Sequence, residues 1–289
     1  TSFDIAVACV AVIVLFEAGR RIIGPALPII AGVFLAYDYF GQYMPDIIAH
    51  QGASLNKLAG HMYLTTEGVF GVPLGVSVSF IYLFVLFGSL LERAGAGQYF
   101  INLAFALLGK FRGGPAKASV IASGLTGMVS GSSTANVVTV GTFTIPLMKK
   151  AGLTGTKAGA IEVAAGVNGQ LMPPIMGAAA FIIAEFLGLS YTNVMIAAVI
   201  PAFVCYLSLF FIVHLESCKL GLKGMEQGTG ISKLKIFVSG LHYLIPILVL
   251  LYTLLIANES PISAAFNAIC VLFLIILFQE PVRKIAHGE

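Results

Sequence analysis

The sequence predicts an all-α polytopic membrane protein with about six transmembrane helices, one re-entrant helical hairpin and one broken helix. Three observations predict it: low charge, long apolar segments and two polar interruptions. Charged residues make up 10% of the 289 residues and hydrophobic residues 58%, with a mean hydropathy of +0.97. Soluble domains are about 25% charged, so lipid is the expected solvent. This composition excludes a soluble enzyme, a nucleic-acid-binding domain and a disordered tail.

Six apolar segments are candidates for crossing a bilayer, which takes about 20 residues. They are residues 2–18, 22–40, 70–91, 191–214, 239–257 and 262–278. Residues 46–67 read as a polar loop with a surface helix, and residues 98–109 as a short arm helix flat at the interface. We expect N-terminal scaffold helices and an external loop over 1–69, a helix plus the arm over 70–112, a transport-type unit over 113–190 and C-terminal scaffold helices over 191–289.

The first interruption follows Lys117, after which no charged residue occurs before Lys149. Two crossings and a turn would need about 40 residues, and one crossing only about 20. The middle of this segment, residues 130–136, is polar. We therefore expect a re-entrant hairpin over residues 117–149, made of two half-helices of about 12 residues that each rise about 18 Å.

The second interruption lies within residues 158–188 and predicts one span broken at mid-depth. Gly166 and Gly169 loosen the helix, and the consecutive prolines Pro173 and Pro174 remove two backbone donors. Irregular backbone is tolerated at membrane depth only where it is buried in protein or lines a water-filled cavity. The break therefore indicates a site.

The distribution of charge supports this topology. With Arg20 and Arg21 in the cytoplasm and the hairpin returning to its own side, Lys57 is the one member of the 16 Lys and Arg residues that falls outside. A hairpin read as a single crossing would divide the basic residues between the two sides. Thr1 is then expected outside and Glu289 inside.

The two interruptions supply uncharged oxygen atoms, as in the sites of secondary transporters. The candidate ion- and substrate-binding residues are Ser130, Gly131, Ser132, Ser133, Thr134 and Asn136 of the hairpin, and Gly166, Asn168, Gly169, Gln170, Met172, Pro173 and Pro174 of the broken helix. Such oxygens suit Na⁺ and not a transition metal, which prefers His, Cys or carboxylate ligands. No other cofactor is expected. The alternative interpretation is close helix packing through the glycines, among them Gly127 and Gly131.

Glu162 lies one turn before Gly166 and is a possible proton site, because carboxylates inside a membrane are usually functional. Its side chain would alternatively extend to the interface, since Lys157 is only five residues away. A proton-coupled carrier is therefore kept as an alternative to a sodium-coupled one.

Other function classes fit less well. A channel filter can also use a re-entrant loop, but a broken span facing the hairpin favours a transporter. An intramembrane serine hydrolase would need a general base at mid-depth and typically a G-x-S-x-G motif, and the sequence contains neither. A metalloprotease would need H-E-x-x-H, which is absent. A scaffold subunit would not need to bury a polar cluster.

Three segments resemble the large membrane component of the tripartite ATP-independent periplasmic (TRAP) transporters. They are Gly-Gly-Pro-Ala-Lys at 113–117, Ser-Gly-Ser-Ser-Thr-Ala-Asn at 130–136 and Thr-Ile-Pro-Leu-Met-Lys-Lys at 144–150. Residues 169–181 are similar to the variant that fuses the small and large components and works with a TAXI-type binding protein. The resemblance is strongest from about residue 67 to 224.

The resemblance implies sodium-driven symport of organic anions, commonly dicarboxylates and other carboxylates, across a bacterial or archaeal inner membrane. It implies a periplasmic TAXI-type substrate-binding protein as partner, and an elevator-like movement of a transport domain against a scaffold. The family also has a second, inverted hairpin and broken helix, which we do not find in this sequence. We therefore expect the chain to carry the first of two half-sites and to act with the remainder of the same permease. Residues 166–169 also differ from the Ser-Thr-Gly-Gly run expected before Gln170.

Overall fold

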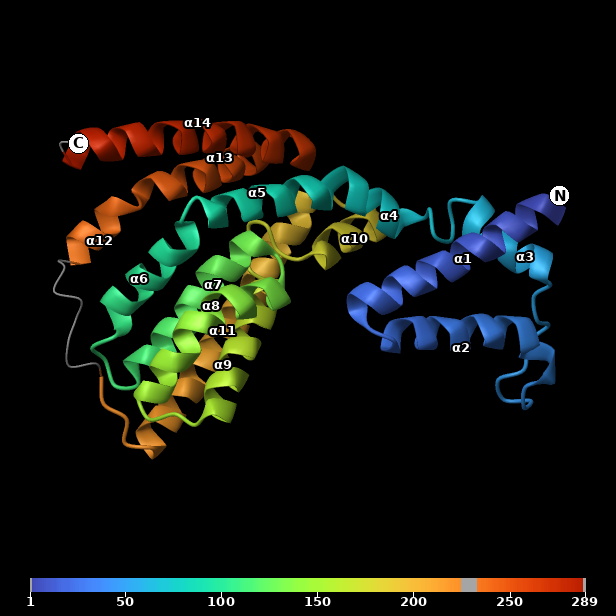
Figure 1. Ribbon diagram of the computed structural model, residues 1–289, viewed down its shortest axis with the longest axis horizontal. Helices are drawn as coiled ribbons and strands as arrows, with labels where there is room; N and C mark the ends of the chain where they lie inside the picture. The colour runs from blue at the N-terminus through green and yellow to red at the C-terminus, as the bar shows by residue number, and fades with distance from the viewer. Residues whose placement is uncertain (1, 225–232, 288–289) are drawn as a thin grey trace. The chain divides into compact units, whose positions relative to one another are not determined.

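The computed structural model describes residues 2–224 and 233–287, and these ranges contain helices and no strand (Figure 1). The all-α prediction is therefore confirmed for the part of the chain that the structure describes. The chain divides into two compact units, Thr1–Gly75 and Val76–Glu289. Each unit is described by itself below.

The first unit is built on two long helices, α1 (Ser2–Ile23) and α2 (Ala26–Phe40), which pack against each other. Gly24, with φ 94°, and Pro25 separate them. The short helix α3 (Leu55–Ala59) and a π-helical turn (Gly60–Leu64) follow and pack on α1. They confirm the helix expected within the polar loop.

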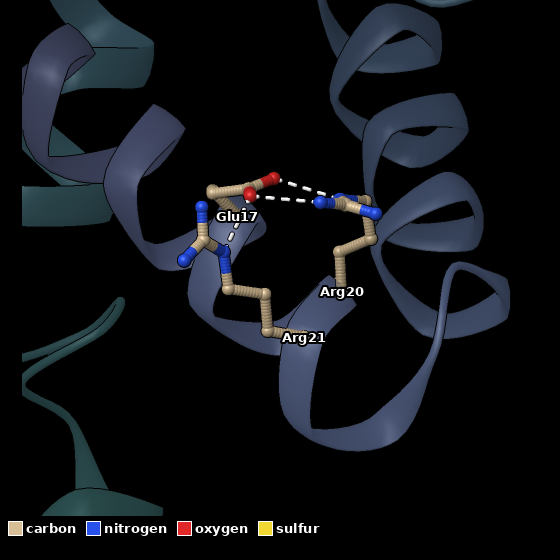
Figure 2. Close-up of polar contacts among 3 residues, drawn as sticks. All are labelled: Glu17, Arg20 and Arg21. Atoms are coloured by element: carbon tan, nitrogen blue, oxygen red, sulfur yellow. Dashed lines mark hydrogen bonds and ion pairs between the residues drawn. The ribbon is translucent and has the colours of Figure 1, made fainter.

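Glu17 holds the two arginines at the end of α1 (Figure 2). Arg20 donates two hydrogen bonds to its carboxylate, at 2.7 and 2.8 Å, and Arg21 donates one at 2.7 Å. Both arginine side chains are largely exposed, and that of Glu17 is partly exposed. Exposed ion pairs of this kind contribute little to the free energy of unfolding. They orient the two arginine side chains at the end of α1 but do not stabilise the fold appreciably.

A continuous apolar helix, Val72–Arg93, leads into the second unit and comprises α4 (Val72–Val76), a π-helical turn (Ser77–Ile81) and α5 (Tyr82–Arg93). The helices that follow are α6 (Ala96–Leu108), α7 (Gly114–Ser130), α8 (Ser133–Lys150), α9 (Gly155–Gly169), α10 (Ala178–Leu187), α11 (Tyr191–Lys219), α12 (Lys233–Ser239), α13 (Leu244–Leu255) and α14 (Pro261–His287).

Three described helices are long and apolar enough to cross a membrane: Val72–Arg93, Tyr191–Lys219 and Pro261–Gln279. The pair Lys233–Ser239 and Leu241–Leu255, bent by 41°, would make a fourth. The expected spans at residues 2–18 and 22–40 correspond to α1 and α2, and α2, with 15 residues, is short for a crossing.

The expected hairpin consists of α7 and α8, which lie side by side (Figure 1). Its turn is formed by Gly131, at φ 62°, and by Ser132, whose hydroxyl caps α8 by accepting from the Ala135 amide at 3.3 Å. The arms are longer than expected, with 17 and 18 residues instead of 12. The sequence interpretation took the lysines as the outer limits, whereas Lys117 is a buried residue inside α7. Each arm thus rises about 25 Å.

The expected break in the helix over residues 158–188 is also present. Helix α9 ends at Gly169 and α10 begins at Ala178. The amide of Gly177 donates to the carbonyl oxygen of Gln170 at 2.7 Å and closes the intervening loop. Helices α7, α8 and α9 pack on one another, and α11 packs on α7 and α9 (Figure 1). We call α7, α8 and α9 the three-helix unit.

Candidate ion- and substrate-binding site

The tip of the hairpin touches the break in the following helix. A Cβ atom built on Gly131 would lie 2.5 Å from the carbonyl oxygen of Met176. Gly131 also has φ 62°, a conformation that residues with side chains rarely adopt. Glycine is therefore required here twice over, and it brings the tip backbone directly against the interrupted helix.

A second close approach lies one turn further into the unit. A Cβ on either Gly127 or Gly169 would lie 2.8 Å from the Cα of the other. The alternative interpretation as a packing residue is thus supported for Gly127. The same packing brings α7 and α9 together at the level of the tip, so it builds the site as well.

Helix α11 fixes the backbone of the break through Tyr191. The hydroxyl of Tyr191 lies within hydrogen-bonding distance of the carbonyl oxygens of Pro174 and Ile175, at 2.8 and 2.7 Å. Its ring stacks on Phe181 with centroids 4.2 Å apart. Met176, between these anchors and the tip, has φ 56°. Backbone strain at a residue with a side chain is concentrated at functional sites, and the sequence interpretation did not single out Met176 or Tyr191.

A cavity of about 380 Å³ opens where the tip meets the break. Ser130, Gly131 and Ser132 line it from the hairpin, and Ile175 and Met176 from the break. Ser132 caps α8 and the lining residue Ala178 begins α10, so two helix N-termini lie at the cavity. Helix N-termini stabilise negative charge.

Helix α5 contributes a carboxylate that the sequence interpretation missed. Glu92 lines the tip cavity and also a neighbouring cavity of about 420 Å³ along the hairpin, whose wall includes Thr139 and Thr142. It is half-buried and is the one charged side chain among the described residues that line the tip cavity. Glu92 directly follows the expected apolar span 70–91, where charged residues commonly lie at the membrane interface.

Asn136 is fully buried where the three helices meet. Its Nδ2 donates to the carbonyl oxygen of Ser123 at 3.2 Å and to the Ser123 hydroxyl at 2.5 Å. Because a carbonyl can only accept, this contact fixes the orientation of the amide. Oδ1 is buried and has no hydrogen-bond partner among the described residues. A buried acceptor without a donor is rare and is available to a ligand.

Glu162 is also fully buried, between α8 and α9. The Thr144 hydroxyl lies 2.6 Å from Oε2, and Oε1 has no hydrogen-bond partner among the described residues. The alternative in which this side chain extends to the interface is therefore wrong. Lys157, which motivated it, instead pairs with Glu216 of α11.

The other candidate residues are more dispersed. Ser133 and Asn168 are half-buried, and Thr134 and Gln170 are exposed. No side-chain hydrogen bond in the described ranges joins Asn168 or Gln170 to the tip. Met172 and Pro173 line a different, apolar cavity of about 490 Å³ beside α11. Gly166 faces Asn136, since its Cβ would lie 3.2 Å from Nδ2. The structure thus joins the two interruptions through their backbones rather than through the amides of the break.

The sequence interpretation also did not include Ser123 and Thr144 among the candidate site residues. Periodicity offered one signal, because Asn136, Val140 and Thr144 recur at intervals of four and share one face of α8. A helical projection of α8 would have placed Thr144 on the same face as Asn136, about two turns further along the helix.

A family model described as the tripartite ATP-independent periplasmic transporter, DctM component, matches residues 10–287. The chain is 28% identical to a C4-dicarboxylate TRAP transporter large permease protein of Vibrio cholerae, covering 72% of the chain and 42% of that protein. It is 25% identical to the 2,3-diketo-L-gulonate TRAP transporter large permease protein of Escherichia coli, covering 66% and 45%. It is 37% identical to a C4-dicarboxylate large permease protein of Rhodobacter capsulatus over 32% of the chain and 21% of that protein. The chain spans half the length or less of these relatives.

Proposed function

The chain belongs to the DctM family of tripartite ATP-independent periplasmic transporters, and we propose that it supplies one half-site for Na⁺-coupled uptake of organic anions. Members of this family are multi-pass inner-membrane transporters and not enzymes. The named relatives transport C4-dicarboxylates or a keto sugar acid, so a carboxylate is the proposed substrate class. A periplasmic TAXI-type binding protein and the remainder of the permease are the proposed partners.

One observation carries the proposal: the tip of the hairpin rests on the break of α9–α10, with hydroxyl and carbonyl oxygens at the contact and the unpartnered Oδ1 of Asn136 in the same three-helix unit. Na⁺ prefers a shell of hard, uncharged oxygens to nitrogen or sulfur ligands. The partnerless Oδ1 of Asn136, the hydroxyls of Ser130 and Ser132 and the carbonyl groups of the break are such oxygens. Transporters commonly bind the coupling cation with unwound backbone of this kind.

The tip cavity is the proposed place of the substrate carboxylate. Two helix N-termini favour an anion there, whereas Glu92 opposes one. Opposite unit charges 4 Å apart attract by about 4 kcal/mol at an effective dielectric constant of 20, and like charges repel by the same amount. Bound Na⁺ would offset Glu92, so that the anion binds well only after the cation. This order of binding is the proposed basis of coupling.

The proposed movement and topology follow from the same arrangement. The three-helix unit with α10 would form the transport domain that shifts against a scaffold, and the hairpin would enter and leave the membrane on the cytoplasmic side. About six spans in addition to the hairpin and the broken helix remain the proposed count. A proton-coupled carrier is the second candidate, on the observation that Glu162 is fully buried.

Uptake of a labelled dicarboxylate into proteoliposomes tests the proposed function, with the intact permease and its binding protein present. Uptake should saturate with substrate and require an inward Na⁺ gradient. A flux that rises in proportion to substrate and voltage, without saturation, would identify a channel instead.

A further inference from the structure

The hydroxyl of Thr144 has two neighbours and only one proton. Its oxygen lies 2.6 Å from Glu162 Oε2 and 3.0 Å from the carbonyl oxygen of Val140. A carbonyl oxygen accepts and never donates, and an ionised carboxylate does the same. If Glu162 were ionised, Thr144 would therefore face two acceptors and leave one contact without a proton. If Glu162 is protonated, its acid group donates to Thr144, and Thr144 donates to Val140.

The surroundings of Glu162 provide no counter-charge. The groups to consider are Lys117 of α7, Lys149 and Lys150 of α8, Lys157 of α9 and Tyr206 of α11. Lys117 Nζ lies 5.6 Å from the centre of the Phe210 ring, the side chains of Lys149 and Lys150 are exposed, and Lys157 pairs with Glu216. The Tyr206 hydroxyl donates to the Ala165 carbonyl oxygen at 2.7 Å. Among the described residues none forms an ion pair with Glu162, and an unpaired buried carboxylate is strongly unfavourable.

The same carboxyl group lies next to the hydrogen bond between Asn136 and Ser123. Ser123 accepts from Asn136 Nδ2 at 2.5 Å, so its own proton is left over, and its hydroxyl lies beside the Glu162 carboxyl group. Donors run in one direction from Glu162 through Thr144 to Val140, and the spare proton of Ser123 is the nearest donor for the unpartnered Oε1. A neutral acid can accept at one oxygen and donate from the other, which an ionised carboxylate cannot do.

We propose that Glu162 is a proton-binding site inside the three-helix unit, and that its neutral acid group joins α8 to α9 and positions Asn136. The proton is a structural ligand, which stays on the carboxyl group while Na⁺ carries the coupling. Glu162 is accordingly a positioning residue for the proposed Na⁺ site. The protonation state itself does not depend on the proposed function; only the sodium readout below rests on it.

Infrared spectroscopy of the intact permease at neutral pH tests the proton directly. The wild type should show the C=O absorption of a protonated carboxylic acid, and Glu162→Gln should lack it. Glu185→Gln is the matched control, since Glu185 is an exposed residue at the end of α10, and it should keep the absorption. Absence of the absorption from the wild type, or its persistence in Glu162→Gln, would overturn the proposal.

A second variant keeps the test decisive if Glu162→Gln does not fold. Thr144→Val preserves the shape of the side chain and removes the acceptor of the acid proton. The acid absorption should persist and move to higher frequency, because the C=O bond strengthens when the acid loses its hydrogen bond. An absorption that does not respond belongs to another group and contradicts the assignment.

The apparent Na⁺ affinity of uptake provides the functional readout. Glu162→Gln should stay within about threefold of the wild type, because a neutral amide can replace both the donor and the acceptor of the acid. Glu162→Leu fills the space without hydrogen bonds and should weaken Na⁺ by about 5- to 150-fold. Equal losses in both variants would show that the negative charge is needed. Uptake by the wild type without Na⁺ would refute the proposed function, while the infrared result would still decide the proton site.

Discussion

Gly131 and Met176 make the contact on which the site depends: a Cβ on Gly131 would lie 2.5 Å from the Met176 carbonyl oxygen. Both residues have positive φ, 62° and 56°. Two backbone segments with positive φ, separated in sequence by the whole of α8 and α9, therefore meet at one point. The hairpin tip and the break have to be shaped together.

Gly131→Ala should destabilise this contact by about 1–3 kcal/mol, because it adds backbone strain and a clash with a carbonyl group that cannot move independently. The matched control is Gly159→Ala in α9, where a Cβ meets nothing within 4 Å. That change should be neutral or stabilising by up to about 1 kcal/mol, since alanine favours helix. Thermal unfolding of both variants and their uptake rates provide the comparison. A Gly131→Ala protein as stable and active as Gly159→Ala would show that the contact is dispensable.

Topology is tested by single cysteines at the two ends of the hairpin, in a background without the four native cysteines. Lys110→Cys and Lys149→Cys are suitable because both positions are exposed, whereas Lys117 is only 7% exposed. Both cysteines should react only with reagents that reach the cytoplasmic side. Labelling from opposite sides would refute the re-entrant hairpin.

Glu92→Gln removes the charged side chain from the wall of the tip cavity. The proposed order of binding depends on Na⁺ offsetting this charge, so the variant should bind the anion with less need for Na⁺. The expected change is a smaller Na⁺-induced increase in substrate affinity, by about tenfold for each 1.4 kcal/mol of repulsion removed. Titrations of substrate at low and high Na⁺ measure it. An unchanged Na⁺ effect would remove Glu92 from the mechanism.

The two interruptions could be predicted from the sequence because each depends on nearby residues alone and not on contacts with distant parts of the chain. The segment between Lys117 and Lys149 is too short for two crossings, and Pro173 and Pro174 cannot continue a helix. The helix ends were less predictable. Lys117 remains helical and buried over Phe210 of α11, a tertiary contact that the local sequence does not reveal.

The buried polar residues Ser123, Asn136, Thr144 and Glu162 were harder to predict as a cluster, because their contacts also depend on tertiary packing. Ser123 lies 13 residues from Asn136, and Thr144 lies 18 from Glu162, so each pair forms only when the three helices pack. A single Ser or Thr in a helix also bonds its own backbone, as Thr144 does to Val140. Its sequence context therefore does not distinguish a site residue from a spacer.

The central claim is that Na⁺, bound at the hairpin tip and the break, drives uptake. The most direct measurement is substrate uptake into proteoliposomes under an imposed Na⁺ or proton gradient, for the wild type, Ser132→Ala, Asn136→Ala and Glu162→Gln. Thr134→Ala is the control, because Thr134 is exposed and does not line the tip cavity. Uptake should follow the Na⁺ gradient. Loss of one neutral ligand at Ser132 or Asn136 should weaken the apparent Na⁺ affinity by about 5- to 150-fold, equivalent to about 1–3 kcal/mol. Thr134→Ala and Glu162→Gln should keep Na⁺-dependent uptake. Uptake that follows the proton gradient and disappears with Glu162→Gln would contradict the account in both the ion and the residue.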